Sequence, residues 1–248
     1  MTVFDREVAD RLAANGTDEE LRTCAGALMK ATIPKRYSYN FSWLGRPIIQ
    51  YPQDIVALQE LIWAVQPDLI IETGIAHGGS LIFSASMLEL NAACGGRQNA
   101  EVLGVDIDIR AHNREAIEAH PISKRIKMLQ GSSIAPDIVE QVTSAAAGKD
   151  SVLVCLDSNH THDHVLAELE AYAGLTSVGS YCVVFDTIVE ELPREFFGDR
   201  PWGPGNNPRT AVRQFLKMHS EFEIDSRIDS KLLVSVAPGG YLKRVRLE

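Results

Sequence analysis

Five short apolar runs, separated by longer stretches with helical periodicity, limit what this chain of 248 residues can fold into. The runs span 68–72, 102–106, 126–129, 152–157 and 181–186. Strands that alternate with helices form parallel sheets, because right-handed crossovers place helices on both faces. We therefore predict an α/β protein with a doubly wound, mostly parallel sheet. Ligands of such sheets bind at the carboxyl ends of the strands, near the point where the strand order reverses.

The two ends of the chain depart from this alternation. Residues 1–45 show little periodicity, and we interpret them as a helical N-terminal arm or lid on a main domain that spans 46–248. Near the C-terminus, the apolar segments 222–228 and 232–236 flank three polar residues, which predicts an antiparallel hairpin that brings the sheet to seven strands. Because the arm has no obvious place in a core, we expect a homo-oligomer.

The net charge and the hydropathy of the chain restrict the kinds of molecule that it can bind. The net charge of −9 disfavours broad binding to nucleic acid or to an anionic membrane surface, both of which use clustered basic residues. No stretch approaches the roughly 20 apolar residues that span a bilayer, and the start lacks a signal-peptide pattern. We expect a cytoplasmic protein with a small-molecule substrate.

A glycine-rich loop follows the first strand, from Glu72 through Gly74, His77 and Gly78 to a helix that begins near Ser80. Glycines allow close backbone approach to a ligand, and free N–H groups at a helix start attract anions. The spacing does not fit the G-x-G-x-x-G of dinucleotide sites and suits a ligand that carries a carboxylate. The alternative is that the glycines only close a tight turn.

Acidic residues also end three of the later predicted strands. Asp106 ends the second one, where folds of this kind bind ribose hydroxyls. Asp157 and Asp186 end two later strands and are expected at the same sheet edge, where two carboxylates can share Mg²⁺. The alternative is that they cap the helices that follow.

Three histidines, His160, His162 and His164, follow Asp157 closely. Two histidines and a carboxylate form the usual non-haem iron site, so iron or zinc is an alternative to Mg²⁺. A single histidine can also act as a general base, because imidazole titrates near neutral pH.

Several motifs together resemble the methyltransferases grouped with cephalosporin hydroxylase and rhamnosyl O-methyltransferases, over roughly residues 40–245. They are Glu72-Thr73-Gly74, Gly78-Gly79-Ser80, Gly-Val-Asp-Ile-Asp at 104–108, Gln130-Gly131-Ser132-Ser133, and the segments 156–162 and 200–208. The resemblance implies a Rossmann-like fold that binds S-adenosylmethionine.

The resemblance also implies roles for individual residues. Glu72, Gly74 and Ser80, with the neighbouring His77 and Gly78, would surround the methionine part of the cofactor, and Asp106 the ribose. Ser132 or Ser133 would contact the adenine, unless these serines cap the helix that follows. Asp157 would lie beside both cofactor and metal.

The layout is more distantly similar to metal-dependent catechol-type O-methyltransferases. These have an Asn as third metal ligand directly after the second Asp, where this chain has Thr187. Thr187, Asn159, Glu190 or water are candidates for that position. The catechol-type enzymes carry a lysine base three residues after the first Asp, and this chain has His160 there.

A loop rich in Gly, Pro and Asn precedes a predicted helix over 209–219. By the resemblance, Trp202, Asn206 and Asn207 would contact the substrate, although the same pattern is typical of a turn with an Asn cap. Tyr37, Tyr39, Trp43 and the segment 45–47 are expected on the opposite wall.

These features predict Mg²⁺-assisted methylation of a hydroxyl group on a sugar or natural-product scaffold. A hydroxylase, or a non-catalytic subunit that binds the cofactor for a partner oxygenase, are the alternatives.

Overall fold

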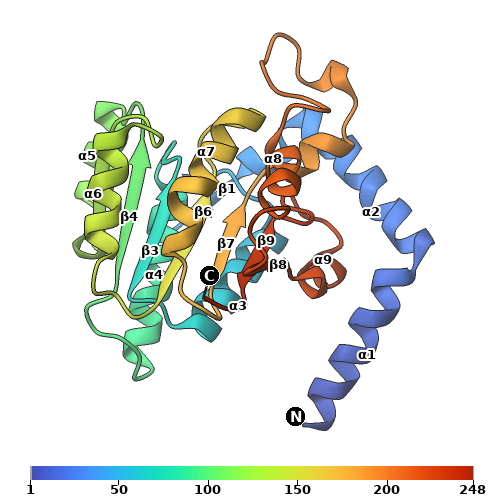
Figure 1. Cartoon of the computed structure of the whole chain (residues 1–248), viewed down its shortest axis with the longest axis horizontal. Coiled ribbons are helices and arrows are strands. Elements are labelled where there is room, and N and C mark those ends of the chain that lie inside the picture. The colour runs from blue at the N-terminus through green and yellow to red at the C-terminus, as the bar shows by residue number, and fades with distance from the viewer. Residues whose placement is uncertain (1, 248) are drawn as a thin grey trace.

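The main sheet has seven strands in the order β5-β4-β3-β6-β7-β9-β8 (Figure 1). This computed structural model describes residues 2–247. The bounds are β3 Leu69–Thr73, β4 Glu101–Asp106, β5 Ile126–Gln130, β6 Val152–Leu156, β7 Tyr181–Val184, β8 Phe222–Ile224 and β9 Tyr241–Arg244. The first five of these strands are parallel, and β9 runs antiparallel to both β7 and β8. The predicted doubly wound, mostly parallel sheet is confirmed.

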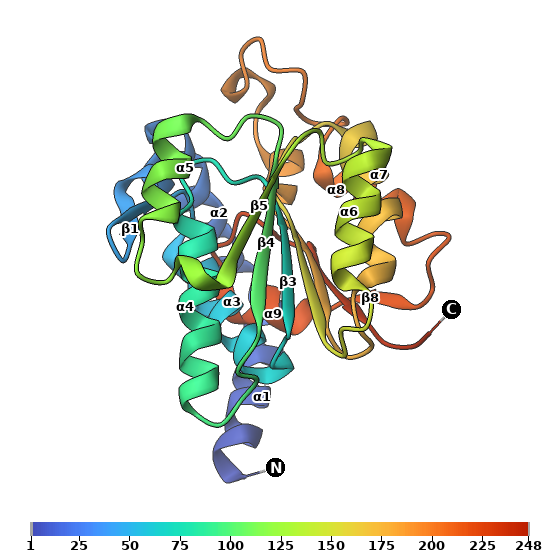
Figure 2. The ribbon, with the colours of Figure 1, turned by 90° about the vertical axis from the view of Figure 1, so that its left-hand side faces the viewer.

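Helices cover both faces of this sheet, as Figure 2 shows edge-on. On one face lie α3 Pro52–Val65, α4 Gly79–Ala93, α5 Ala111–Glu118 and α9 Ser226–Leu232. On the other lie α6 Pro136–Ala146, α7 His162–Tyr172 and α8 Pro208–Phe215. All five residues of β3 and of β6 are buried, because both strands are covered on two faces. The strand order reverses between these two strands, so the carboxyl ends of β3 and β6 mark the expected ligand site.

The predicted C-terminal hairpin is partly wrong. Strands β8 and β9 do pair antiparallel, but the segment between them contains helix α9, and the second strand begins only at Tyr241. Ile228 and Leu232 are four residues apart and pack on the same core cluster, which is helical spacing. Asp225 caps the helix by accepting a hydrogen bond from the N–H of Arg227 at 3.3 Å.

The N-terminal segment is more helical than its weak periodicity predicted. Helices α1 Val3–Thr17 and α2 Glu19–Thr32 precede a short antiparallel pair, β1 Phe41–Trp43 and β2 Arg46–Ile48. The predicted boundary at residue 45 falls in the turn of this pair.

Helix α1 projects from the body of the molecule (Figure 1) and has no buried residue. It contacts α9, where the side-chain amide of Asn15 donates to the carbonyl of Ser230 at 3.3 Å. Within residues 2–247, no helix is both long and apolar enough to cross a membrane.

Candidate active site

The glycine loop after β3 is pressed against two other parts of the chain. Gly74 has φ of +91°, and a Cβ atom there would lie 2.1 Å from the carbonyl oxygen of Asp157. A Cβ atom on Gly79 would lie 2.1 Å from the carbonyl oxygen of Pro47. Side chains at these positions would force the backbone apart. The glycines therefore bring the loop, the end of β6 and the segment before α3 to one site.

Glu72 lies beneath this loop and is 4% exposed. Burial raises the pKa of its carboxyl group from 4.5 to about 7, and hydrogen bonds with Ser80 and Ser84 partly oppose this rise. One carboxyl oxygen, Oε1, has no hydrogen-bond partner within the described residues. A cationic ligand group beside Glu72 would therefore be strongly favoured, as a cofactor amine would be.

Asp106, at the end of β4, holds the glycine loop in place. One of its oxygens accepts from the backbone N–H groups of Ile75 at 2.7 Å and Ala76 at 3.2 Å, and the other accepts from that of Asp108 at 3.0 Å. The structure thus shows a loop-fixing function that the sequence did not indicate. The predicted contact with ribose stays a prediction.

The remaining loop residues shape the start of α4. Gly78 is the N-cap of this helix with φ of +82°, and a Cβ atom there would meet the side chain of Ile117 at 2.3 Å. The carbonyl of His77 accepts two hydrogen bonds from the guanidinium group of Arg46. His77 and Ser80 both line the cavity described below.

Ser132 and Ser133 do not cap the following helix, so that alternative is wrong. Helix α6 has Ala135 as its N-cap, without a side-chain hydrogen bond. The hydroxyl of Ser133 lies 3.1 Å from Nε2 of His164, and its carbonyl accepts from the hydroxyl of Tyr172. Contact of these serines with adenine remains a prediction.

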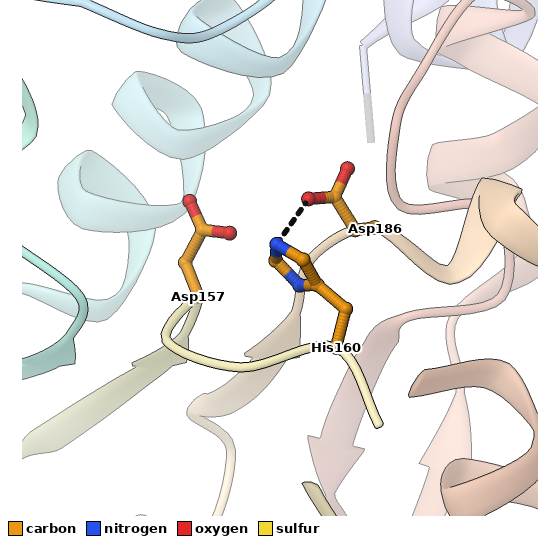
Figure 3. A group of neighbouring side chains, drawn as sticks. All are labelled: Asp157, His160 and Asp186. Atoms are coloured by element: carbon orange, nitrogen blue, oxygen red, sulfur yellow. Dashed lines mark ion pairs between the residues drawn. The ribbon is translucent and has the colours of Figure 1, made fainter. Parts of the chain in front are cut away.

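Asp157, His160 and Asp186 converge at the carboxyl ends of β6 and β7 (Figure 3). One possible ligand atom from each residue lies within 4.8 Å of the others, and Nε2 of His160 is 3.2 Å from Oδ2 of Asp186. Burial raises the pKa of Asp157 well above its ordinary value, and the charge of Asp186 raises it further. Two carboxylates at such close range fit a divalent cation, which would offset the cost of keeping the buried Asp157 ionised.

The alternative that these acids cap helices is not observed. The N-cap of α7 is Thr161, and Asp186 precedes a short 3-10 turn without a capping hydrogen bond from its side chain. Asp186 has a left-handed backbone, with φ of 54° and ψ of 23°, a conformation that Asp tolerates better than most residues. The chain therefore turns sharply directly after β7.

The side chains considered for the third metal ligand all have hydrogen-bond partners outside this cluster. Thr187 is fully buried, and its hydroxyl donates to the carbonyl of Pro238 at 2.8 Å. The side chain of Asn159 accepts from Thr161 at 2.9 Å, and Glu190 accepts from the backbone of Gly205 at 2.8 Å. We therefore correct the prediction of Thr187 as a metal ligand. His160 is the third group that the structure brings to the two aspartates.

The other two histidines lie elsewhere. His162 contacts Thr210 at 2.8 Å and Gln214 at 3.1 Å and so links α7 to α8. His164 lies 3.6 Å from Glu168 on α7. A site with two histidines and a carboxylate, as iron would require, is not formed by the histidines of this loop in the described structure.

The loop over 200–208 reaches the cluster through one residue. Trp202 packs edge-on against His160, with ring centroids 5.0 Å apart, and lines the cavity. Asn206 instead accepts from the N–H of His162 at 2.8 Å, and the fully buried Asn207 caps α8. The predicted substrate contacts of Asn206 and Asn207 are therefore corrected to structural roles, because their polar atoms are occupied by the loop itself.

A cavity of about 510 Å³ opens above the cluster. Its lining comes from the glycine loop, the strand ends and residues within 33–39, 47–51 and 188–202. Of the residues predicted for the wall opposite the loop, Tyr39 and Pro47 line the cavity, whereas Tyr37, Trp43, Gly45 and Arg46 are not among its lining residues. Pro47 packs against Gly79 of the glycine loop itself. Gln50, Arg36 and Arg200 also line the cavity, and sequence reasoning missed them because nothing in their spacing marks a site. The amide of Gln50 donates to Oδ2 of Asp157 at 3.3 Å.

Comparison with known proteins gives consistent matches. A family model described as Rhamnosyl O-methyltransferase/CmcI matches residues 35–245. The rhamnosyl O-methyltransferase of Mycobacterium tuberculosis is 29% identical over 198 residues, which cover 77% of this chain and 73% of the relative. That of Mycobacterium leprae is 29% identical over 212 residues, or 82% of each chain.

Solved structures share the fold at lower identity. A structure of CmcI with Mg and S-adenosylmethionine has a TM-score of 0.57 at 18% identity, and the match covers 84% of this chain and 78% of the other. An O-methyltransferase of Bacillus cereus in complex with S-adenosylhomocysteine has a TM-score of 0.50 at 16% identity, with 90% and 88% covered.

Proposed function

The chain belongs to the rhamnosyl O-methyltransferase/CmcI family, and we propose that it methylates a hydroxyl group of a small molecule with S-adenosylmethionine and Mg²⁺. The observation that carries this proposal is the cluster of Asp157, His160 and Asp186 directly beside the glycine loop. It places two hard oxygen donors and a possible base at one edge of the sheet.

The residues present fit both groups. Asp157 and Asp186 would hold the cation, and the buried carboxyl of Glu72 with its free oxygen would receive the cofactor's amino group. When bound, Mg²⁺ lowers the pKa of a coordinated hydroxyl group, and S-adenosylmethionine supplies an electrophilic methyl group. In the relatives, CmcI is described with the same two groups.

His160 is the proposed base of the reaction. Its contact of 3.2 Å with Asp186 and its packing against Trp202 hold the ring at the cavity floor. A proton leaving the acceptor hydroxyl can pass to this imidazole, and the adjacent carboxylate stabilises the resulting imidazolium. The acceptor oxygen bonds to the methyl carbon as the carbon–sulfur bond breaks.

The cavity walls indicate the kind of acceptor. Apolar side chains from the segment after β7 line one side, together with Trp202. They are Ile188, Val189, Leu192, Phe196 and Phe197. An apolar and aromatic wall above a polar floor suits a molecule that has a hydroxylated edge and an apolar face, such as a deoxy sugar or a natural-product ring.

Three further proposals concern the N-terminal segment, the assembly of the protein and its location in the cell. We propose that residues 1–45 act as an arm or lid, that the exposed helix α1 takes part in homo-oligomer contacts, and that the enzyme works in the cytoplasm. The proposal of a lid rests on the residues within 33–39 that line the cavity, and the proposal of oligomer contacts rests on the absence of buried residues in α1. A light-scattering mass of the full chain and of a variant without residues 2–17 tests the second.

The first experiment is a calorimetric titration with S-adenosylmethionine and with NAD, each with and without Mg²⁺. We expect micromolar binding of S-adenosylmethionine alone. Asp186→Asn is then expected to abolish methyl transfer to acceptors found by screening while it leaves cofactor affinity within about threefold. Binding of NAD in preference, or full turnover by Asp186→Asn, contradicts the proposal. Methyl transfer by the isolated chain excludes a purely supporting subunit.

A further inference from the structure

Gln50 is a buried polar residue whose place at the site has no other explanation in the fold. It lies between β2 and α3, is 4% exposed, and lines the cavity. Among the described residues of the cavity lining, it is the only one with a side-chain amide. A buried amide in a cavity is retained against the cost of its dehydration, so its contacts carry information about function.

The nitrogen of this amide orients Asp157. Within residues 2–247, the carboxylate of Asp157 accepts a single hydrogen bond, from Nε2 of Gln50 at 3.3 Å. The two residues are 107 positions apart in the chain, so this contact exists only through the fold. An aspartate that binds a cation must present its oxygens in a fixed direction, and outer partners commonly supply that restraint.

The oxygen of the same amide is free. Oε1 of Gln50 is buried and has no hydrogen-bond partner in the described part of the chain. Amide oxygens are among the donors that Mg²⁺ accepts. The hydroxyl of Thr187, the residue after Asp186, is occupied by the carbonyl of Pro238, whereas the amide of Gln50 lines the cavity and contacts Asp157.

We propose that Gln50 belongs to the cation site: its N–H group orients Asp157, and its free oxygen faces the cation as a further hard donor. This inference rests on the proposed function, because it assumes that Asp157 and Asp186 bind a divalent metal. It places a further oxygen donor on the segment before α3, far in sequence from the strand-end acids.

Binding of Mn²⁺ to the full chain, followed by electron paramagnetic resonance with S-adenosylmethionine present, tests the assignment without relying on turnover. Gln50→Met keeps the length of the side chain and removes both polar atoms. We expect its Kd for Mn²⁺ to rise about tenfold or more, the range found when outer partners of metal ligands are lost. The affinity for S-adenosylmethionine, measured without metal, is expected to stay within about threefold.

Gln53→Met is the matched control. Gln53 also has a buried Oε1 without a partner in the described structure, but it lies in α3 and does not line the cavity. Its Kd for Mn²⁺ is expected to match the wild type. If Gln50→Met does not fold, as judged by circular dichroism, Gln50→Asn provides the same test, because it keeps the amide and withdraws it by one methylene group.

The outcomes separate this inference from the function on which it rests. If the wild type does not bind Mn²⁺, the metal part of the proposed function fails. If the wild type binds Mn²⁺ and the Gln50 variant binds it equally well, only the assignment of Gln50 is overturned. Equal weakening in the Gln50 and Gln53 variants also overturns it, because the effect would then be a general loss of packing.

Discussion

The raised pKa of Glu72 makes the stability of this protein depend on pH in a way that one substitution can isolate. Burial raises the pKa of Glu72 from 4.5 to about 7. Since one pKa unit corresponds to about 1.4 kcal/mol, the ionised form destabilises the ligand-free fold by about 3 kcal/mol. Between these two pKa values the folded chain binds more protons than the unfolded chain, so the contribution of Glu72 to stability falls as the pH rises.

Glu72→Gln removes this titration and keeps the shape of the side chain. We expect the difference in free energy of unfolding, variant minus wild type, to grow by about 2.5 kcal/mol in favour of the variant from pH 5 to pH 8. Most of the change should occur between pH 4.5 and 7, the window set by the two pKa values. Urea unfolding of both proteins, without cofactor, at closely spaced pH values measures it.

Taking the change in this free-energy difference between two pH values removes effects of the substitution that do not depend on pH. A difference in packing between Gln and Glu shifts the free-energy difference equally at every pH and therefore cancels. Glu140→Gln, at an exposed position on α6, is the control, and its difference curve should be flat. Parallel curves for Glu72→Gln and the wild type would show that Glu72 is not held in its neutral form, and the argument that a cationic ligand group completes this site would lose its basis.

Two further substitutions test the geometry of the site. Gly74→Ala places a Cβ atom 2.1 Å from the carbonyl oxygen of Asp157 at a residue with φ of +91°. We expect it to lower the free energy of unfolding by about 2 to 4 kcal/mol, measured by urea unfolding, and unchanged stability would mean that the loop is not packed as described. Trp202→Ala removes the ring that packs on His160 and lines the cavity. Because such an aromatic contact is worth about 1.5 kcal/mol, steady-state kinetics with an acceptor from the screen should show KM raised about tenfold with a smaller change in kcat. An unchanged KM would place the acceptor away from this loop.

Sequence patterns were sufficient for the parts of this fold that depend on local periodicity. The apolar runs of β3 to β7 and the helix after the glycine loop lie where the patterns predicted. The convergence of Asp157 and Asp186 followed as well, since the carboxyl ends of parallel strands share one edge. At the C-terminus the patterns were misleading, because Ile228 and Leu232 fit a short strand as readily as one face of helix α9.

The sequence alone therefore determined the sheet, the glycine loop and the pair of strand-end acids, because strand and helix periods and glycine spacing are encoded in neighbouring residues. Only the tertiary structure decided which other side chains lie beside these acids. It brings His160 to the acids and takes His162 and His164 into other contacts. It also turns Thr187 away and supplies Gln50 from 107 positions earlier in the chain. These outcomes depend on the direction in which each turn leaves its strand and on contacts between distant segments, neither of which has a local sequence signal.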